Sequence, residues 1–310
     1  MGNFAVAGVT QIETIVKVRK IPITYQELTN EKGSIYTSMG GDAFNEALAL
    51  KWLGDDVRFM SIIGREDDPE SLNPQHQKIK IGTDYVIPQM EATPNCVILY
   101  DEDRQQQIFE DPKDLRDNVY DMNLFTPVGA WADMVVLANA NFCRPFAEAA
   151  SKYGKKIAVN IRYYNKEKEK YNEDFLKVAS ILYFSDDTIT EDPYDFVKGM
   201  SERYGTEIII LGQGSKGVIL YDRNQDLIAH YNTVKTNEIV NTVGAGNAMF
   251  ACFLHYYQEN GDSVNAIKNG LLFSSYKIGY MGTSNGFMTT DQVEQWRNLI
   301  WGIKPVQGSI

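Results

Sequence analysis

The sequence predicts an α/β protein built on a central, mostly parallel β-sheet that is covered by helices. Short runs rich in β-branched and aromatic residues alternate with longer segments whose apolar residues recur at helical spacing. This alternation favours a parallel sheet, because each connection between parallel strands needs a helix-sized crossover. The expected strands are Phe4–Gly8, Val57–Ile63, Met134–Ala138, Lys156–Asn160, Ile181–Phe184 and Glu207–Leu211.

Amphipathic segments between these strands predict the helices that cover the sheet. They carry apolar residues at helical spacing, and most of them end near a glycine. A further helical pattern, from Ala248 to Tyr257, follows a run of small residues. The other expected helices are Asp42–Gly54, Asp68–Ile81, Pro145–Gly154 and Pro193–Tyr204.

Two regions interrupt this alternation with strands and turns. They cover about residues 12–38 and 85–112, and the second is expected to form a meander from Val86–Met90, Asn95–Tyr100 and Gln105–Phe109. An antiparallel excursion of this kind predicts a small β-sheet lid over a ligand crevice. A structural flap at a dimer contact remains the alternative. Because no linker or internal repeat divides the chain, we expect a single domain over residues 1–310.

Charge and cysteine content limit the classes of partner. The chain has 30 Lys and Arg against 41 Asp and Glu, a formal charge of −11, which disfavours nucleic acids and anionic membrane surfaces. An anionic ligand must therefore be bound by a few local groups and not by a basic surface. The widely spaced Cys96, Cys143 and Cys252 suggest neither a disulfide framework nor a zinc site. With no apolar stretch long enough to cross a bilayer, we expect a cytoplasmic protein.

Two glycine-containing segments predict different local structures. Gly212–Gly217 matches the spacing of a dinucleotide-binding loop, but Val218–Tyr221 continues as a strand where that loop requires a helix. We therefore expect a hairpin, and an NAD-linked oxidoreductase is disfavoured. In Asn241–Asn247, by contrast, small residues run directly into a helix, whose free amides can hold a phosphate group. A tight turn leading into a buried helix is the alternative for this segment.

A third segment, Gly40–Asn45, also opens a helix. Gly41 would let a small ligand approach the backbone closely. Asp42 and Asn45 lie on the first turn, where they can hydrogen-bond hydroxyl groups or cap the helix.

Together these segments resemble the ribokinase-like (PfkB) family of carbohydrate kinases, in the same order and over nearly the whole chain. The early signature resembles Gly40–Asn45 and the late signature resembles Asn241–Asn247. Ile63–Asp67 and Asn160–Arg162 resemble further motifs of the family, and Gly214–Gly217 resembles its turn beside the nucleotide.

The resemblance implies ATP-dependent phosphorylation of a sugar hydroxymethyl group, with Mg²⁺, beneath a β-lid through which family members often form homodimers. It implies an anion hole at Gly244, Ala245 and Gly246, with the base of the family at the position of Asn247. The implied sugar-binding residues are Glu13, Gly41, Asp42, Asn45 and Arg162. The implied nucleotide-binding residues are Gly214, Gly217, Thr242, Gly244 and Gly246.

The chain departs from the family pattern at several of these positions. Asn247 replaces the aspartate that acts as base, and a carboxamide is not a usable base at neutral pH. Asn241 replaces an aspartate that helps to hold a monovalent cation, while Ser185 and Thr188 replace residues that support magnesium binding. Glu13 replaces a sugar-binding aspartate. Two hypotheses follow: a kinase whose activity is in doubt, or a pseudokinase that binds sugar or nucleotide in a regulatory or scaffolding role.

Overall fold

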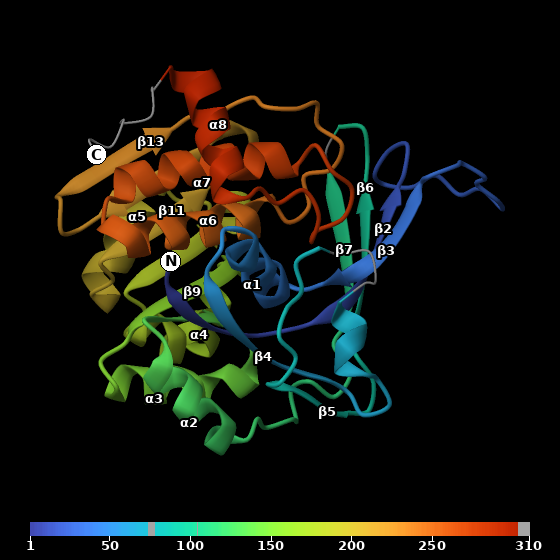
Figure 1. Ribbon diagram of the computed structural model, residues 1–310. Helices are drawn as coiled ribbons and strands as arrows, with labels where there is room; N and C mark the ends of the chain where they lie inside the picture. The colour runs from blue at the N-terminus through green and yellow to red at the C-terminus, as the bar shows by residue number, and fades with distance from the viewer. Residues whose placement is uncertain (74–77, 104, 303–310) are drawn as a thin grey trace.

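A nine-stranded sheet forms the centre of the computed structural model, which describes residues 1–73, 78–103 and 105–302 (Figure 1). Its strand order is β13-β12-β11-β10-β9-β8-β1-β4-β5. The strands from β11 to β5 run parallel, whereas β12 and β13 add an antiparallel hairpin at one edge. The bounds are β1 (Asn3–Ala7), β4 (Asp56–Gly64), β5 (Val86–Met90), β8 (Met134–Ala138), β9 (Lys156–Tyr163), β10 (Ile181–Ser185), β11 (Ile208–Gly212), β12 (Val218–Asp222) and β13 (Leu227–Tyr231). The predicted fold class and all six predicted strands are confirmed.

Helices cover both faces of this sheet, as the two separate apolar clusters of the core show. Alternate residues of β1 enter different clusters, with Phe4 and Val6 on one face and Ala5 and Ala7 on the other. Figure 1 shows α6, α7 and α8 on one side of the sheet and α2, α3 and α4 on the opposite side. The first cluster includes residues of α1 (Asp42–Trp52), α6 (Ala245–Asn260), α7 (Ser263–Lys277) and α8 (Thr290–Trp301). The second includes residues of α2 (Met122–Trp131), α3 (Arg144–Lys152), α4 (Glu169–Val178) and α5 (Pro193–Tyr204).

No helix among the described residues is long and apolar enough to cross a membrane.

A smaller sheet of four strands, in the order β3-β2-β6-β7, projects from one side of the central sheet (Figure 1). Its strands are β2 (Gln11–Lys17), β3 (Ile35–Gly40), β6 (Asn95–Tyr100) and β7 (Gln106–Asp111). The expected meander was wrong in one strand, because Val86–Met90 pairs in parallel with β4 as the last strand of the central sheet. Val86 and Met90 are buried in the two core clusters, which favours this position over one in the lid.

The helix predicted over Asp68–Ile81 is also corrected. Within residues 68–73 there is a short 3₁₀ helix, Pro69–Leu72, and residues 78–81 are not helical; residues 74–77 lie outside the described part of the chain. The side chain of Asn73 bonds to the backbone N–H and C=O of Ile81, at 2.8 and 2.9 Å. These two bonds join Asn73 to Ile81, within the segment for which the apolar spacing predicts a helix.

Candidate active site

A cleft of about 1400 Å³ lies between the two sheets. The carboxyl ends of β9, β10 and β11 contribute Arg162, Ser185 and Gly212, and the smaller sheet contributes Glu13 and Gln106. Strand β1 is flanked by β4 on one side and β8 on the other, so the chain reverses its direction of progress across the sheet at this point. Ligands of open α/β sheets bind outside the strand carboxyl ends at such reversals.

The start of α6 forms the floor of this cleft. Gly244 has a left-handed backbone conformation, with φ of 79°, and the side chain of Asn241 accepts the N–H of Val243 at 2.8 Å. The N–H of Ala245 is donated to Thr242 O at 3.2 Å. The amides of Gly246 and Asn247, in the first turn of the helix, have no intrahelical acceptor and are therefore the ones suited to an anion. A Cβ atom at Gly246 would overlap the hydroxyl of Tyr183, which explains the glycine.

Asn247 lies in a chain of polar side chains beneath the cleft. Its Nδ2 donates to Oδ1 of Asp42 at 2.9 Å, and its Oδ1 accepts from Nδ2 of Asn160 at 3.0 Å. The same Asn160 nitrogen lies 2.6 Å from Oε1 of Glu46. Glu46 is fully buried, and this burial raises the pKa of its carboxyl well above the ordinary value. The arrangement brings Asn247 together with Asp42, two residues that are 205 positions apart.

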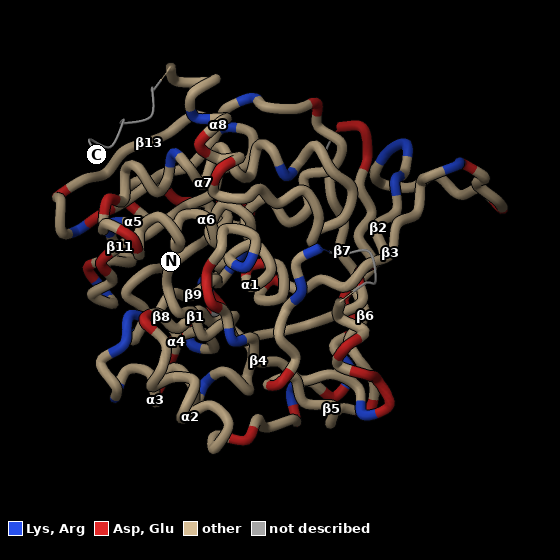
Figure 2. Tube along the Cα trace, in the orientation of Figure 1, with Lys and Arg blue, Asp and Glu red and all other residues tan. Residues whose placement is uncertain are grey.

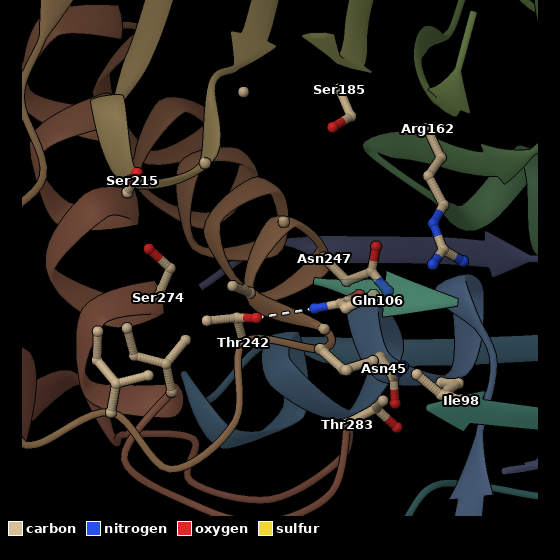
Figure 3. A pocket seen from close by; sticks show the side chains of 18 of the residues that line it. Asn45, Ile98, Gln106, Arg162, Ser185, Ser215, Thr242, Asn247, Ser274 and Thr283 are labelled. Carbon is tan, nitrogen blue, oxygen red and sulfur yellow. Dashed lines mark hydrogen bonds between the residues drawn. The ribbon is translucent and has the colours of Figure 1, made fainter. Parts of the chain in front are cut away.

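Arg162 reaches the cleft from a distorted end of β9. The pairing of β9 with β10 passes from Asn160–Tyr183 to Arg162–Phe184, so Ile161 forms a bulge, and Arg162 has φ of 56°. The guanidinium lies over the ring of Tyr163 and 3.5 Å from Oδ1 of Asp42. Figure 3 shows Arg162 and Asn247 directed into the same space. Backbone strain of this kind tends to be retained where a side chain must be aimed at a ligand.

Glu13 and Asn45 line the same end of the cleft in different ways. The two Glu13 oxygens accept bonds from Gln11 (2.9 Å), the N–H of Gly41 (3.0 Å) and the hydroxyl of Thr283. Burial raises the pKa of Glu13, although these hydrogen bonds act in the opposite direction. Asn45 is 1% exposed, and its Oδ1 has no hydrogen-bond partner among the described residues. A buried acceptor left open beside a cleft is suited to a ligand hydroxyl.

The opposite end of the cleft is lined by Gly214, Ser215 and Ser274, with Thr242 between the two ends (Figure 3). The predicted hairpin is confirmed, because a 3₁₀ turn, Gly214–Lys216, leads directly into β12. Gly217 and Gly41 are not among the lining residues. Gly217 instead packs against the backbone of Tyr231, and the N–H of Gly41 is donated to Glu13.

Two oxygen-bearing side chains at the end of β10, those of Ser185 and Asp187, line the cleft. Thr188 donates its hydroxyl to Tyr164 O and does not line the cleft, whereas Asp187 does. The Ser185 hydroxyl donates to Oδ2 of Asp187 at 2.7 Å. Within the described ranges, no group of three or more His, Cys, Asp or Glu residues is arranged around a common metal position. One carboxylate completed by phosphate oxygens is nevertheless a usual site for Mg²⁺, and Asp187 with Ser185 fits it.

Sequence reasoning missed Asp187 and two other residues. Gln106 of β7 donates from Nε2 to Oγ1 of Thr242 at 2.8 Å, which joins the smaller sheet to the loop before α6 (Figure 3). Lys277 is entirely buried behind that loop. Neither residue belongs to a motif, so only the three-dimensional contacts could identify them.

Most of the predicted site residues do line the cleft as one group. They are the anion-hole residues together with Thr242, Glu13, Asp42, Asn45 and Arg162.

Comparison with known proteins identifies relatives of this architecture. A family model described as pfkB family carbohydrate kinase matches residues 1–291. Deoxyribokinase from Salmonella typhi is 31% identical over 111 residues, which are 35% of this chain and 35% of that protein, so the match spans about a third of the relative. A microbiome-derived acarbose kinase superimposes with a TM-score of 0.81 at 22% identity, covering 95% of this chain and 98% of the other. Arabidopsis thaliana ribokinase complexed with ribose and ATP gives 0.74 at 17% identity, covering 95% and 98%.

Proposed function

Because this chain belongs to the pfkB family of carbohydrate kinases, we propose that it transfers the γ-phosphoryl group of ATP to a hydroxymethyl group of a sugar. The sugar lies between the smaller sheet and the start of α6, where Asn45 and Arg162 bind its hydroxyl groups. The nucleotide occupies the end of the cleft lined by Gly214, Ser215 and Ser274.

The observation that carries this proposal is the contact between Asn247 and Asp42. A positioned general base contributes about 10² to 10⁴ in rate, and the amide of Asn247 cannot supply it. The carboxylate of Asp42 lies 2.9 Å from that amide, lines the cleft and is 29% exposed. In our account, Asp42 accepts the proton of the attacking hydroxyl, while Asn247 orients the carboxylate and Arg162 compensates its charge.

The remaining work of the site is to position phosphate and stabilise charge, which dominates phosphoryl transfer. The free amides of Gly246 and Asn247 hold the transferred group at the positive end of the α6 dipole. Magnesium, when held by Asp187 and Ser185, would neutralise charge on the phosphates. The bond from Gln106 to Thr242 ties the smaller sheet to the loop before α6 and so keeps it over the site.

The test is consumption of ATP by the purified protein against a panel of aldoses, ketoses and nucleosides. We expect turnover with at least one sugar, and a product that carries the phosphate ester on the oxygen of a hydroxymethyl group. The rival pseudokinase instead predicts thermal stabilisation by ATP or a sugar, with no turnover for any member of the panel. An absence of both turnover and stabilisation would contradict both hypotheses.

We also propose a homodimer formed through the outer face of the smaller sheet. Ile35, Val97 and Phe109 are 65%, 37% and 52% exposed, and the strand pairing brings them to the face opposite the cleft. Exposed apolar groups gathered on one sheet face favour association with a second copy. Sedimentation velocity should give twice the chain mass of 35.1 kDa, and Phe109→Glu should lower it to the monomer value. A wild-type monomer at micromolar concentration would contradict this proposal.

A further inference from the structure

Lys277 is the last residue of α7, and its side chain is buried with no exposed surface. A buried ammonium group is costly unless it is paired or hydrogen-bonded. Its Nζ donates to the carbonyl oxygen of Gly282 at 2.7 Å and to that of Val243. The amine therefore connects two loops that are separated along the chain.

Both loops line the cleft beside the start of α6. Val243 precedes Gly244, which leads into the first turn of α6, and Gly282 precedes Thr283, whose hydroxyl binds Glu13. The loops also pack directly, since a Cβ atom at Gly244 would lie 3.0 Å from Thr283 O. Any group that holds the Val243 carbonyl thus also fixes the direction of the amides at the start of α6.

The family resemblance implies a monovalent cation near Asn241, but the residues present do not fit one. Asn241 is uncharged, and its Oδ1 accepts the N–H of Val243. Its Nδ2 is directed at Sδ of Met281, 3.9 Å away. The nearby carbonyl oxygens of Val243 and Gly282 already converge on an amine that is covalently part of the protein. A metal ion would have to displace it.

We infer that Lys277 acts as a built-in cation at this position, so that the anion-binding start of α6 is held in place without K⁺ or Na⁺. The uncharged Asn241 and the buried Lys277 then together replace the aspartate and the metal cation that the family resemblance implies. Burial lowers the pKa of Lys277 to about 7, while the Glu13 carboxylate acts in the opposite direction. The two carbonyl acceptors also favour the charged form. Lys277 touches no reacting atom and is a positioning residue.

The first test uses the wild-type protein in K⁺, Na⁺ or tetramethylammonium chloride at equal ionic strength. Thermal unfolding and the affinity for ATP are measured beside turnover, so that the result does not depend on the proposed activity. We expect all three quantities to be independent of the cation, with rates and affinities equal within about twofold. Stabilisation or tighter nucleotide binding in K⁺ or Na⁺, but not in tetramethylammonium, would overturn the inference.

The second test removes the amine with Lys277→Met, which keeps an unbranched side chain that is one heavy atom shorter. We expect the midpoint of thermal unfolding to fall by roughly 5 °C or more, because two carbonyl oxygens lose their donor. Adding Asn241→Asp should then make stability and ATP binding respond to K⁺. Lys268→Met, at an exposed position of the same helix, is the matched control and should change neither quantity. Equal behaviour of the two methionine variants would contradict the inference, and the wild-type measurement stands even if Lys277→Met fails to fold.

Discussion

At the scale of single residues, the amide of Asn247 has two neighbours that a carboxylate could not satisfy together. Its nitrogen donates to Asp42 and its oxygen accepts from Asn160. An aspartate at position 247 would lose the donor and place two carboxylates in contact, which raises the pKa of one of them. In the proposed chemistry, Asp42 therefore compensates for the departure from the family pattern at Asn247, and the two residues act as one unit.

Glu46 gives a prediction at the same scale. Its raised pKa means that, above pH 4.5, the unfolded chain loses this proton before the folded protein does. The stability contributed by the protonated carboxyl is therefore present below pH 4.5 and is lost as the pH rises towards the folded-state pKa. Glu46→Gln should remove this loss. The unfolding free energy of the variant minus that of the wild type should therefore grow, as the pH rises, by up to about 1.4 kcal/mol per pH unit. Urea unfolding between pH 4.5 and 8 measures it.

A control for this measurement is Glu294→Gln, at an exposed position of α8. This variant should follow the wild-type curve at every pH. Parallel curves for wild type and Glu46→Gln would show that Glu46 does not titrate differently in the folded and unfolded protein.

At the scale of elements, the sequence predicted the helices and strands that depend on local residue pattern. It missed the features that depend on pairing or contact with distant segments. Buried strands are continuous apolar runs, so all six were found, but nothing in Val86–Met90 indicates that it pairs with β4. Helix α2 contains Pro127, which conceals its pattern. The motifs located the start of α6 and Arg162. The contact of Asn247 with Asp42 and the contacts of Lys277 with two loops could not be predicted, because they join distant segments.

The first turn of α6 gives the prediction at this scale. Gly246→Ala would drive a methyl group into the Tyr183 hydroxyl, so we expect a loss of roughly 1–3 kcal/mol of stability and weaker ATP binding. Tyr183→Phe added to this variant should restore part of both. Gly199→Ala in α5 is the matched control, since a Cβ atom there meets nothing within 4 Å. It should stabilise the protein by about 0.5–1 kcal/mol. Equal effects of the two alanine substitutions would contradict the proposed packing.

At the scale of the whole molecule, acidic and basic residues are interspersed over most of the elements (Figure 2). The chain carries a net charge of −11. In the proposed function the cleft nevertheless holds phosphate, because the attraction comes from backbone amides and a helix dipole at one point. The two sheets must also stay together around the ligands. The bond from Gln106 to Thr242 links the smaller sheet to the loop before α6, which packs on the central sheet through the helix that follows.

Removing that link with Gln106→Ala should raise KM for ATP about two- to tenfold, as expected for one hydrogen bond of about 0.5–1.5 kcal/mol. We expect a smaller effect on kcat, because the hydrogen bond that is removed is made to Thr242 and not to Asp42. Gln107→Ala alters the next residue of β7, which does not line the cleft, and should leave KM unchanged. Steady-state kinetics of both variants measure this, and a KM for Gln106→Ala equal to that of wild type would argue against a functional link between the smaller sheet and the loop before α6.

The most direct test of the proposed chemistry is a double-mutant cycle at Asp42 and Asn247, with kcat measured on the best sugar. Asp42→Asn should lower kcat by about 10² or more, because it removes the base. Asn247→Asp alone should also lower kcat, since it forces two carboxylates together. The double variant returns a single carboxylate to the site, at position 247, and should recover to within about tenfold of wild type. Full activity of Asp42→Asn, or a gain of activity in Asn247→Asp alone, would contradict the assignment of Asp42 as the base.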